Sequence, residues 1–215
     1  MPNNMWYTFF NITMPASQYA FLAAVIIVCV LLYLVNRTTD IDGFLNDIIL
    51  FVIVWKLSYI SSNWSEFINY PLAVVYFNGG LVGIYSGLLV VIAYELYKNR
   101  QNLHDGFFRR FYFIFFEMFA LYNFFFLILT KVDLKLMIVS TIFYFLIGVC
   151  IVFTFRKKQY VLQIISMLLL ILVTLFSLLE PLGIHQLKIA LLVVFVFIWN
   201  IAYWLMVKRR DHVEN

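Results

Sequence analysis

Charged residues are scarce in this 215-residue sequence, at only 12% of the chain, whereas 65% of the residues are hydrophobic. A water-soluble domain carries about a quarter charged residues and about half apolar residues. The deficit excludes a single soluble domain and predicts that most of the chain lies in a lipid bilayer. The net charge of +4 predicts no nucleic-acid role, because basic residues in a membrane protein mostly set its topology.

Residue patterns of redox, metal and soluble-enzyme sites are also absent. The two cysteines, Cys29 and Cys150, lie far apart in apolar segments and form no Cys-x-x-Cys motif. The sequence has no phosphate-binding loop, nucleophile elbow or zinc-protease motif. The three histidines fall in predicted loops or in the tail, and His185 is the best placed of them for a role. We therefore predict no metal site and no cofactor.

Long apolar stretches dominate the chain instead. Seven of them are long enough for a helix to cross about 30 Å of hydrocarbon. They are too long and too unbroken for barrel strands, and a bilayer requires backbone groups to be satisfied within each segment. We predict an all-α membrane protein without a soluble domain, forming one polytopic domain over residues 1–215. The expected spans are 19–35, 44–60, 72–97, 111–129, 134–155, 160–179 and 189–207.

Basic residues are divided unequally between the two sets of predicted loops, with 11 on one side and 3 on the other. The richer side holds Arg37, Lys98, Arg100, Arg109, Arg110, Arg156, Lys157, Lys158, Lys208, Arg209 and Arg210, and the poorer side holds Lys131, Lys135 and Lys188. Basic loops stay in the cytoplasm, so the N-terminus is predicted outside and the C-terminus inside. Residues 1–16 lack a basic start, which argues against a cleavable signal peptide.

Polar residues inside predicted spans are candidates for function, because such groups usually face a bundle interior or a wet cavity. Lys56 and Asn123 lie about 6 Å and 9 Å from the outer ends of their spans, and Tyr85 lies about 12 Å below the outer surface. Tyr59 follows Lys56 by three residues and shares its face. These four residues predict a site for a lipid phosphate in the outer leaflet. Alternatively, Lys56 only extends its ammonium outward to water.

Two further carboxylates lie in predicted spans. Glu95 is two residues from the inner end of its span, so it is expected to reach water. Glu117 lies about two turns into its span and follows Arg110 by seven residues, on nearly the same helical face. This spacing favours a solvated or paired structural carboxylate.

Four glycines occur in the third predicted span, which Pro71 introduces from the outer loop. Gly79, Gly83 and Gly87 recur at every fourth position, and Gly80 adds a consecutive pair. Such spacing predicts a smooth face for close helix packing. Glycine also permits close approach of a lipid or a backbone.

The order of these features resembles the prolipoprotein diacylglyceryl transferase family, seven-span bacterial enzymes with an outside N-terminus. VWKLSY at 54–59 resembles the family's Gly-Ala-Arg-Leu-x-Tyr stretch, with Lys56 in the place of the arginine and Tyr59 in that of the tyrosine. NYPL at 69–72 resembles its Asn-Pro-Leu, and Gly79 and Gly80 match its Gly-Gly pair. HQLKI at 185–189 faintly resembles its last-span Gln motif.

Departures from the family concern its chemistry. YSG at 85–87 replaces a His-Gly-Gly, so Tyr85 stands where the family has histidine. FALYNF at 119–124 keeps Asn123 and Phe124 but has Ala120 in place of an arginine. The family moves a diacylglyceryl group from phosphatidylglycerol to a cysteine thiol, which requires a base and cations. Tyrosine is a poor base at neutral pH. The family's outer head domain is also missing, since only 130–133 joins the fourth and fifth spans.

The resemblance implies a bacterial plasma-membrane protein that binds an anionic phospholipid such as phosphatidylglycerol through Lys56, Tyr59, Tyr85 and Asn123. Loss of the base implies an accessory subunit with a membrane or lipoprotein partner. Two alternatives stay open. One is an active lipid transferase with an altered site, and the other is a small transporter or channel subunit.

Overall fold

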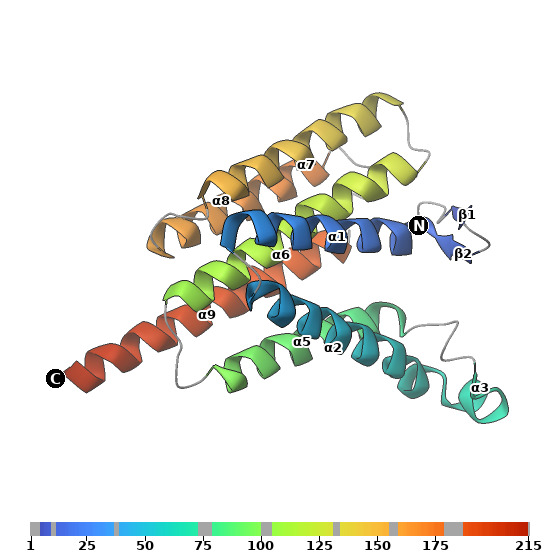
Figure 1. The fold of residues 1–215 in the computed structure, drawn as a ribbon, viewed down its shortest axis with the longest axis horizontal. Coiled ribbons are helices and arrows are strands. Elements are labelled where there is room, and N and C mark those ends of the chain that lie inside the picture. The colour runs from blue at the N-terminus through green and yellow to red at the C-terminus, as the bar shows by residue number, and fades with distance from the viewer. Residues whose placement is uncertain are drawn as a thin grey trace. The chain divides into compact units, whose positions relative to one another are not determined.

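The computed structural model describes residues 5–9, 12–36, 39–72, 79–99, 105–130, 134–154, 159–178 and 187–214. These residues form one two-stranded antiparallel hairpin and eight helices (Figure 1). The elements are β1 (Trp6–Phe9), β2 (Ile12–Pro15), α1 (Ala16–Asn36), α2 (Thr39–Ser62), α3 (Trp64–Asn69), α5 (Gly80–Lys98), α6 (Asp105–Leu129), α7 (Leu134–Thr154), α8 (Gln159–Ser177) and α9 (Leu187–Glu214).

The chain forms two compact units. One, here called the α6 unit, comprises Met1–Leu31 and His104–Asn215. It contains the hairpin, most of α1, and helices α6 to α9. The other, here called the α2–α5 unit, comprises Leu32–Leu103 and contains α2, α3 and α5.

Helix α6 is the packing centre of its unit. Its aromatic residues follow one another at helical spacing and stack on those of the antiparallel helix α9. The ring centroids of Phe115 and Phe195 are 3.3 Å apart, and those of Phe108 and Trp199 are 4.8 Å apart. Phe111 stacks on both Phe195 and Trp199. Aromatic pairs contribute beyond the area that they bury, so this ladder fixes the register of α6 on α9.

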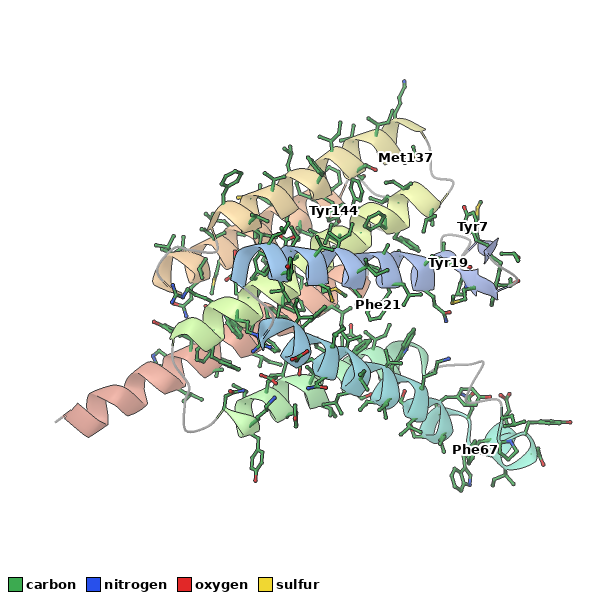
Figure 2. The ribbon with its side chains drawn as sticks, viewed as in Figure 1. Tyr7, Tyr19, Phe21, Phe67, Met137 and Tyr144 are labelled. Atoms are coloured by element: carbon green, nitrogen blue, oxygen red, sulfur yellow. The ribbon has the colours of Figure 1, made fainter. Side chains whose placement is uncertain are left out.

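Helices α7 and α8 extend the same core. Tyr144 on α7 is fully buried and meets Phe119 of α6, with ring centroids 6.1 Å apart (Figure 2). Phe143 stacks on Phe176 of α8 at 4.1 Å. Helix α8 also packs on α6 and α9. The four helices therefore share one apolar interior that is rich in aromatic rings.

Polar side chains within these helices bond mostly to their own backbone. Asn123 Nδ2 donates to the Phe119 carbonyl at 2.8 Å, and Asn200 Nδ2 donates to the Val196 carbonyl at 2.7 Å. Ser166, Thr174 and Ser177 bond in the same way to residues three or four positions earlier. Such bonds allow a polar residue to sit in an apolar helix, where no water is at hand.

The hairpin precedes α1 and is tied to it. Trp6 pairs with Pro15 and Phe9 pairs with Ile12, and the Ala16 amide donates to the Met5 carbonyl at 2.8 Å. The sequence analysis did not predict this element. Its two strands have four residues each, too short for the apolar-run criterion that identifies spans.

The all-α prediction agrees with the structure of the described residues. Three of their helices are long and apolar enough to cross a membrane, namely Ala16–Leu34, Ile41–Ser62 and Phe107–Leu129. Three shorter apolar helices are Met137–Phe153, Val161–Ser177 and Ile189–Leu205. The chain thus has the helices of a multi-pass membrane protein.

The third predicted span differs from the structure at its start. Residues 72–97 were expected to form it, but α5 begins only at Gly80. Leu72 lies in a turn, and 73–78 fall outside the described residues. Gly80 has a φ of 55°, a left-handed conformation that interrupts a right-handed helix at this point. The short helix α3 in the preceding connection was likewise not predicted.

Candidate functional site

Helices α2 and α5 pack closely along the predicted glycine face. A Cβ atom on Gly79 would collide with Ser58 Oγ, and one on Gly87 would lie 2.9 Å from Phe51 Cδ2. On Gly83 it would lie 2.9 Å from the backbone oxygen of Trp55, which cannot move aside as a side chain can. We call this contact the glycine seam, formed by Gly79, Gly83 and Gly87 against Phe51, Trp55 and Ser58.

Backbone hydrogen bonding reinforces the glycine seam at its Gly79 end. The Gly79 amide donates to the Trp55 carbonyl across the two helices at 3.0 Å. Ser58 Oγ donates to the same carbonyl at 2.7 Å. A backbone amide can approach another helix this closely only where no side chain stands between them.

Gly80 and Pro71 affect the conformation of the backbone and not the packing of the glycine seam. A Cβ atom on Gly80 would meet nothing within 4 Å, so its positive φ explains the glycine, and Gly80 is not part of the glycine seam. Pro71 is exposed in the turn that follows α3. Both residues shape the connection between α2 and α5.

Lys56 lies on α2 outside the face that forms the glycine seam, since it is about 200° around the helix from Ser58. It follows Trp55 by one residue, about 100° further around α2. Its side chain is half-buried, six residues before the last residue of α2. The Cα atom of Lys56 therefore lies about 9 Å along α2 from the last residue of the helix. A lysine side chain can cover much of this distance.

Tyr59 is held by a residue that the sequence analysis overlooked. Its hydroxyl donates to Glu66 Oε2 of α3 at 2.9 Å, and only 4% of the residue is exposed. The bond ties α3 to α2 and engages the only proton that the phenol can donate. Figure 2 labels Phe67 on this short helix. The ring centroids of Phe67 and Trp64 are 6.0 Å apart. The sequence could have pointed to Glu66, because it is the only charged residue between positions 57 and 72.

Tyr85 and Asn123 do not join Lys56 within either unit. Tyr85 follows Gly83 by two residues, about 200° around α5, so it lies on the side away from the glycine seam. Asn123 belongs to the α6 unit, is 4% exposed, and bonds to its own helix. Lys56, Tyr59 and Tyr85 thus belong to the α2–α5 unit and Asn123 to the α6 unit.

Glu95 near the C-terminal end of α5 is buried, contrary to the expectation that it reaches water. Lys98 Nζ lies 3.7 Å from its Oε1, and Asn99 Nδ2 donates to its Oε2 at 3.0 Å. Asn99 also closes the last turn of α5 by bonding the Glu95 carbonyl. This carboxylate therefore stabilises a helix terminus.

Glu117 on α6 is also buried, and the prediction of a solvated or paired carboxylate is wrong for the described part of the chain. Only 1% of the residue is exposed, and it makes no hydrogen bond or ion pair with any described residue. Its Oε2 faces Gly148 of α7, where a Cβ atom would lie 3.4 Å away. Arg110 is seven residues earlier, about 10 Å along the helix, so a shared face does not produce a contact.

Metal binding has no support in the described residues, where no three His, Cys, Asp or Glu side chains gather as ligands. His185, the best histidine candidate, lies outside the described residues. The two candidate sites are thus the half-buried cation of Lys56 in α2 and the buried carboxyl of Glu117 in α6. Comparisons with protein-family models, curated proteins and solved structures find no match to this chain.

Proposed function

We propose that this chain is a seven-span protein of a bacterial plasma membrane that binds an anionic phospholipid from the outer leaflet. Lys56 contacts the phosphate of the head group, and the chain lacks the transferase chemistry of the family that it resembles. It acts as an accessory subunit for a membrane or lipoprotein partner. The observation that carries the proposal is a half-buried lysine within α2, a helix long and apolar enough to cross a membrane.

The proposed topology has α1, α2, α5, α6, α7, α8 and α9 crossing the bilayer with the N-terminus outside. The charge asymmetry of the loops supports it. A hydrogen bond between Tyr7 of the hairpin and the last residue of α6 is consistent with it, because both segments are expected outside. Trp64 and Tyr70 are exposed around α3, and such residues favour the membrane interface.

The choice of Lys56 follows from its position. A cation within a membrane-spanning helix is costly and usually has a functional role. Lipid phosphate compensates its charge, and the ammonium binds it as a point charge without the bidentate fork of arginine. Tyr59 cannot donate a second bond while it holds Glu66, so it positions α3 over the site instead of binding phosphate. Tyr85 and Asn123 are left out of this narrower site.

The absence of a base supports binding without transfer. Tyr85 takes the place of the family's histidine and lies on the side of α5 away from the glycine seam. Ala120, in the place of an arginine, is buried in the α6 unit. Thiol attack on a lipid requires proton removal and stabilisation of the leaving phosphate. Lys56 alone supplies only charge.

A melting series in nanodiscs tests the proposal. Phosphatidylglycerol is expected to raise the Tm of the wild type above its value in phosphatidylcholine, because a ligand stabilises the state that binds it. Lys56→Met retains an apolar stem of similar length and loses the shift, whereas Lys56→Arg retains it. Lys135→Met, which removes an exposed lysine from α7, retains it as well. Equal shifts in wild type and Lys56→Met would leave Lys56 as an anchor that reaches toward water.

A further inference from the structure

Glu117 has the environment of a proton-binding group. It lies in the middle of α6, with twelve residues on either side within Asp105–Leu129, about 18 Å from each end. It is buried, and its Oε1 has no hydrogen-bond partner among the described residues. An ionised carboxylate is costly in such a place unless a cation or several donors compensate it.

The surrounding elements offer no such compensation. Charged or phenolic side chains in the described part of α6 and its neighbours include Arg109, Arg110, Tyr112, Tyr122, Lys135, Tyr144 and Tyr203. Glu117 Oε1 makes no hydrogen bond to any of these described side chains. Lys135 is at the far end of α7, about 20 Å along the helix from Gly148. The described side chains of α8 include no titratable residue.

The other buried glutamate provides a contrast within the same chain. Glu95 is as inaccessible as Glu117, yet it has Lys98 at 3.7 Å and the Asn99 amide at 3.0 Å. A lysine and an amide make an ionised carboxylate tolerable at a helix end. A metal ion would require several oxygen ligands around Glu117, and the described residues form no acidic cluster. A proton needs only one oxygen.

We infer that Glu117 is a membrane-embedded proton-binding site, whose carboxyl holds a proton at Oε1 or Oε2 and exchanges it with the solution. Gly148 is the α7 residue that faces the carboxyl, since a methyl group added there would lie 3.4 Å from Oε2. Buried carboxyl groups of this kind within membranes serve proton movement. The site is in the α6 unit and is independent of Lys56, so either proposal can fail alone.

Labelling with dicyclohexylcarbodiimide tests whether the carboxyl is protonated within the bilayer. This apolar reagent reacts with a protonated carboxyl: the carboxyl oxygen bonds to the carbodiimide carbon, and the proton moves to a nitrogen. Acyl migration to the other nitrogen then gives a stable N-acylurea, and nothing is lost. The full chain in liposomes is labelled, digested and mapped by mass spectrometry. We expect label on Glu117, little on Glu95, and none at position 117 in Glu117→Gln.

Infrared spectroscopy of the same liposomes tests exchange. The protonated carboxyl gives a C=O band that is absent in Glu117→Gln and that shifts when the solvent is changed to D2O. Gly148→Ala keeps the carboxyl but covers it, so it should slow both labelling and deuterium exchange, and it tests the site should Glu117→Gln fail to fold. Absence of label on Glu117 in the wild type would overturn the inference. A band that is insensitive to D2O would also overturn it, because the proton would then be permanent.

Discussion

The hydroxyl of Tyr7 donates a hydrogen bond to the backbone carbonyl of Leu129 at 2.6 Å, across 122 positions of sequence. Leu129 is the last residue of α6, and the carbonyls of a last helical turn have no partner within the helix. Thr130 closes the same turn by bonding the Phe126 carbonyl with both its amide and its hydroxyl. The hairpin therefore serves as a cap on α6.

Replacement of Tyr7 by phenylalanine removes this cap and keeps the ring. The lost hydrogen bond is expected to destabilise the α6 unit by about 1 kcal/mol, a typical net value for such a bond. Hydrogen exchange should show faster exchange in the hairpin and in the last turn of α6. Trp6→Phe is the control, since Trp6 is exposed and should leave both segments unchanged. Equal exchange in Tyr7→Phe and wild type would show that the bond does not hold the hairpin.

Gly83→Ala should destabilise the glycine seam. The added methyl lies 2.7 Å from Trp55 Cδ1 and 2.9 Å from the Trp55 carbonyl, so the helices must separate. Overpacking of this kind costs about 1–3 kcal/mol. Gly148→Ala is the matched control, because its methyl meets Glu117 at an ordinary contact distance of 3.4 Å. Thermal unfolding in detergent compares the two, and a Tm for Gly83→Ala at or above that of Gly148→Ala would contradict the close contact.

Tyr59 and Glu66 should behave as one unit in a double-mutant cycle. Tyr59→Phe and Glu66→Gln each weaken the bond between α2 and α3, so each variant should lower the Tm. The double variant should lower it by less than the two single effects together, since the bond can be lost only once. Ser61→Ala is the control, because Ser61 is exposed and bonds only to the Ser58 carbonyl of its own helix. Strictly additive effects would argue against the bond in the membrane.

The orientation of the chain can be measured with reporter fusions. A reporter placed after Asn215 is expected in the cytoplasm, and one inserted within Ser61–Asn69 is expected outside, because basic loops remain inside. Reporters active in opposite compartments distinguish the two positions. Exchange of the two locations would reject the topology and, with it, an outer-leaflet site at Lys56.

Transferase activity is expected to be absent. The purified chain, given phosphatidylglycerol and a peptide with the lipoprotein acceptor cysteine, should transfer no diacylglyceryl group above the rate without protein. The chain should also fail to rescue a cell that lacks the transferase, because Tyr85 and Ala120 stand where the family that it resembles has a histidine and an arginine. Transfer above background would make Lys56 part of an active enzyme.

Sequence alone predicted the helices well and the arrangement of polar residues poorly. Apolar runs identify membrane helices because lipid imposes one requirement on the whole segment. The start of α5 was misjudged because the apolar run continues through Gly79 and Gly80, where the backbone conformation changes. The positions of Lys56 and Tyr85 along α2 and α5 followed from counting residues. A rotation of 100° per residue also gives the helical face of each side chain. Counted from Gly83, this rotation would have placed Tyr85 on the side of α5 away from the glycine seam.

The misassignment of Glu117 has a different cause. Positions seven apart share a helical face, so Arg110 was a reasonable partner by angle alone. The axial distance of about 10 Å separates them, and burial depends on α7, which no local pattern reveals. Likewise, the bond from Tyr59 to Glu66 depends on α3, whose six residues give no periodic signal. Sequence periodicity indicates which residues share a face of one helix, but it does not indicate contacts between separate elements.

The glycine seam has a consequence for the order of events during synthesis. All of its partners lie within Leu32–Leu103, so α2 and α5 can close on each other before the ribosome reaches α6. The hairpin is made first of all, yet its hydrogen bond from Tyr7 to α6 cannot form until Leu129 emerges. The earliest-made element is therefore among the last to dock, and pulse-labelled nascent chains shorter than 129 residues should carry a closed α2–α5 pair and an undocked N-terminus.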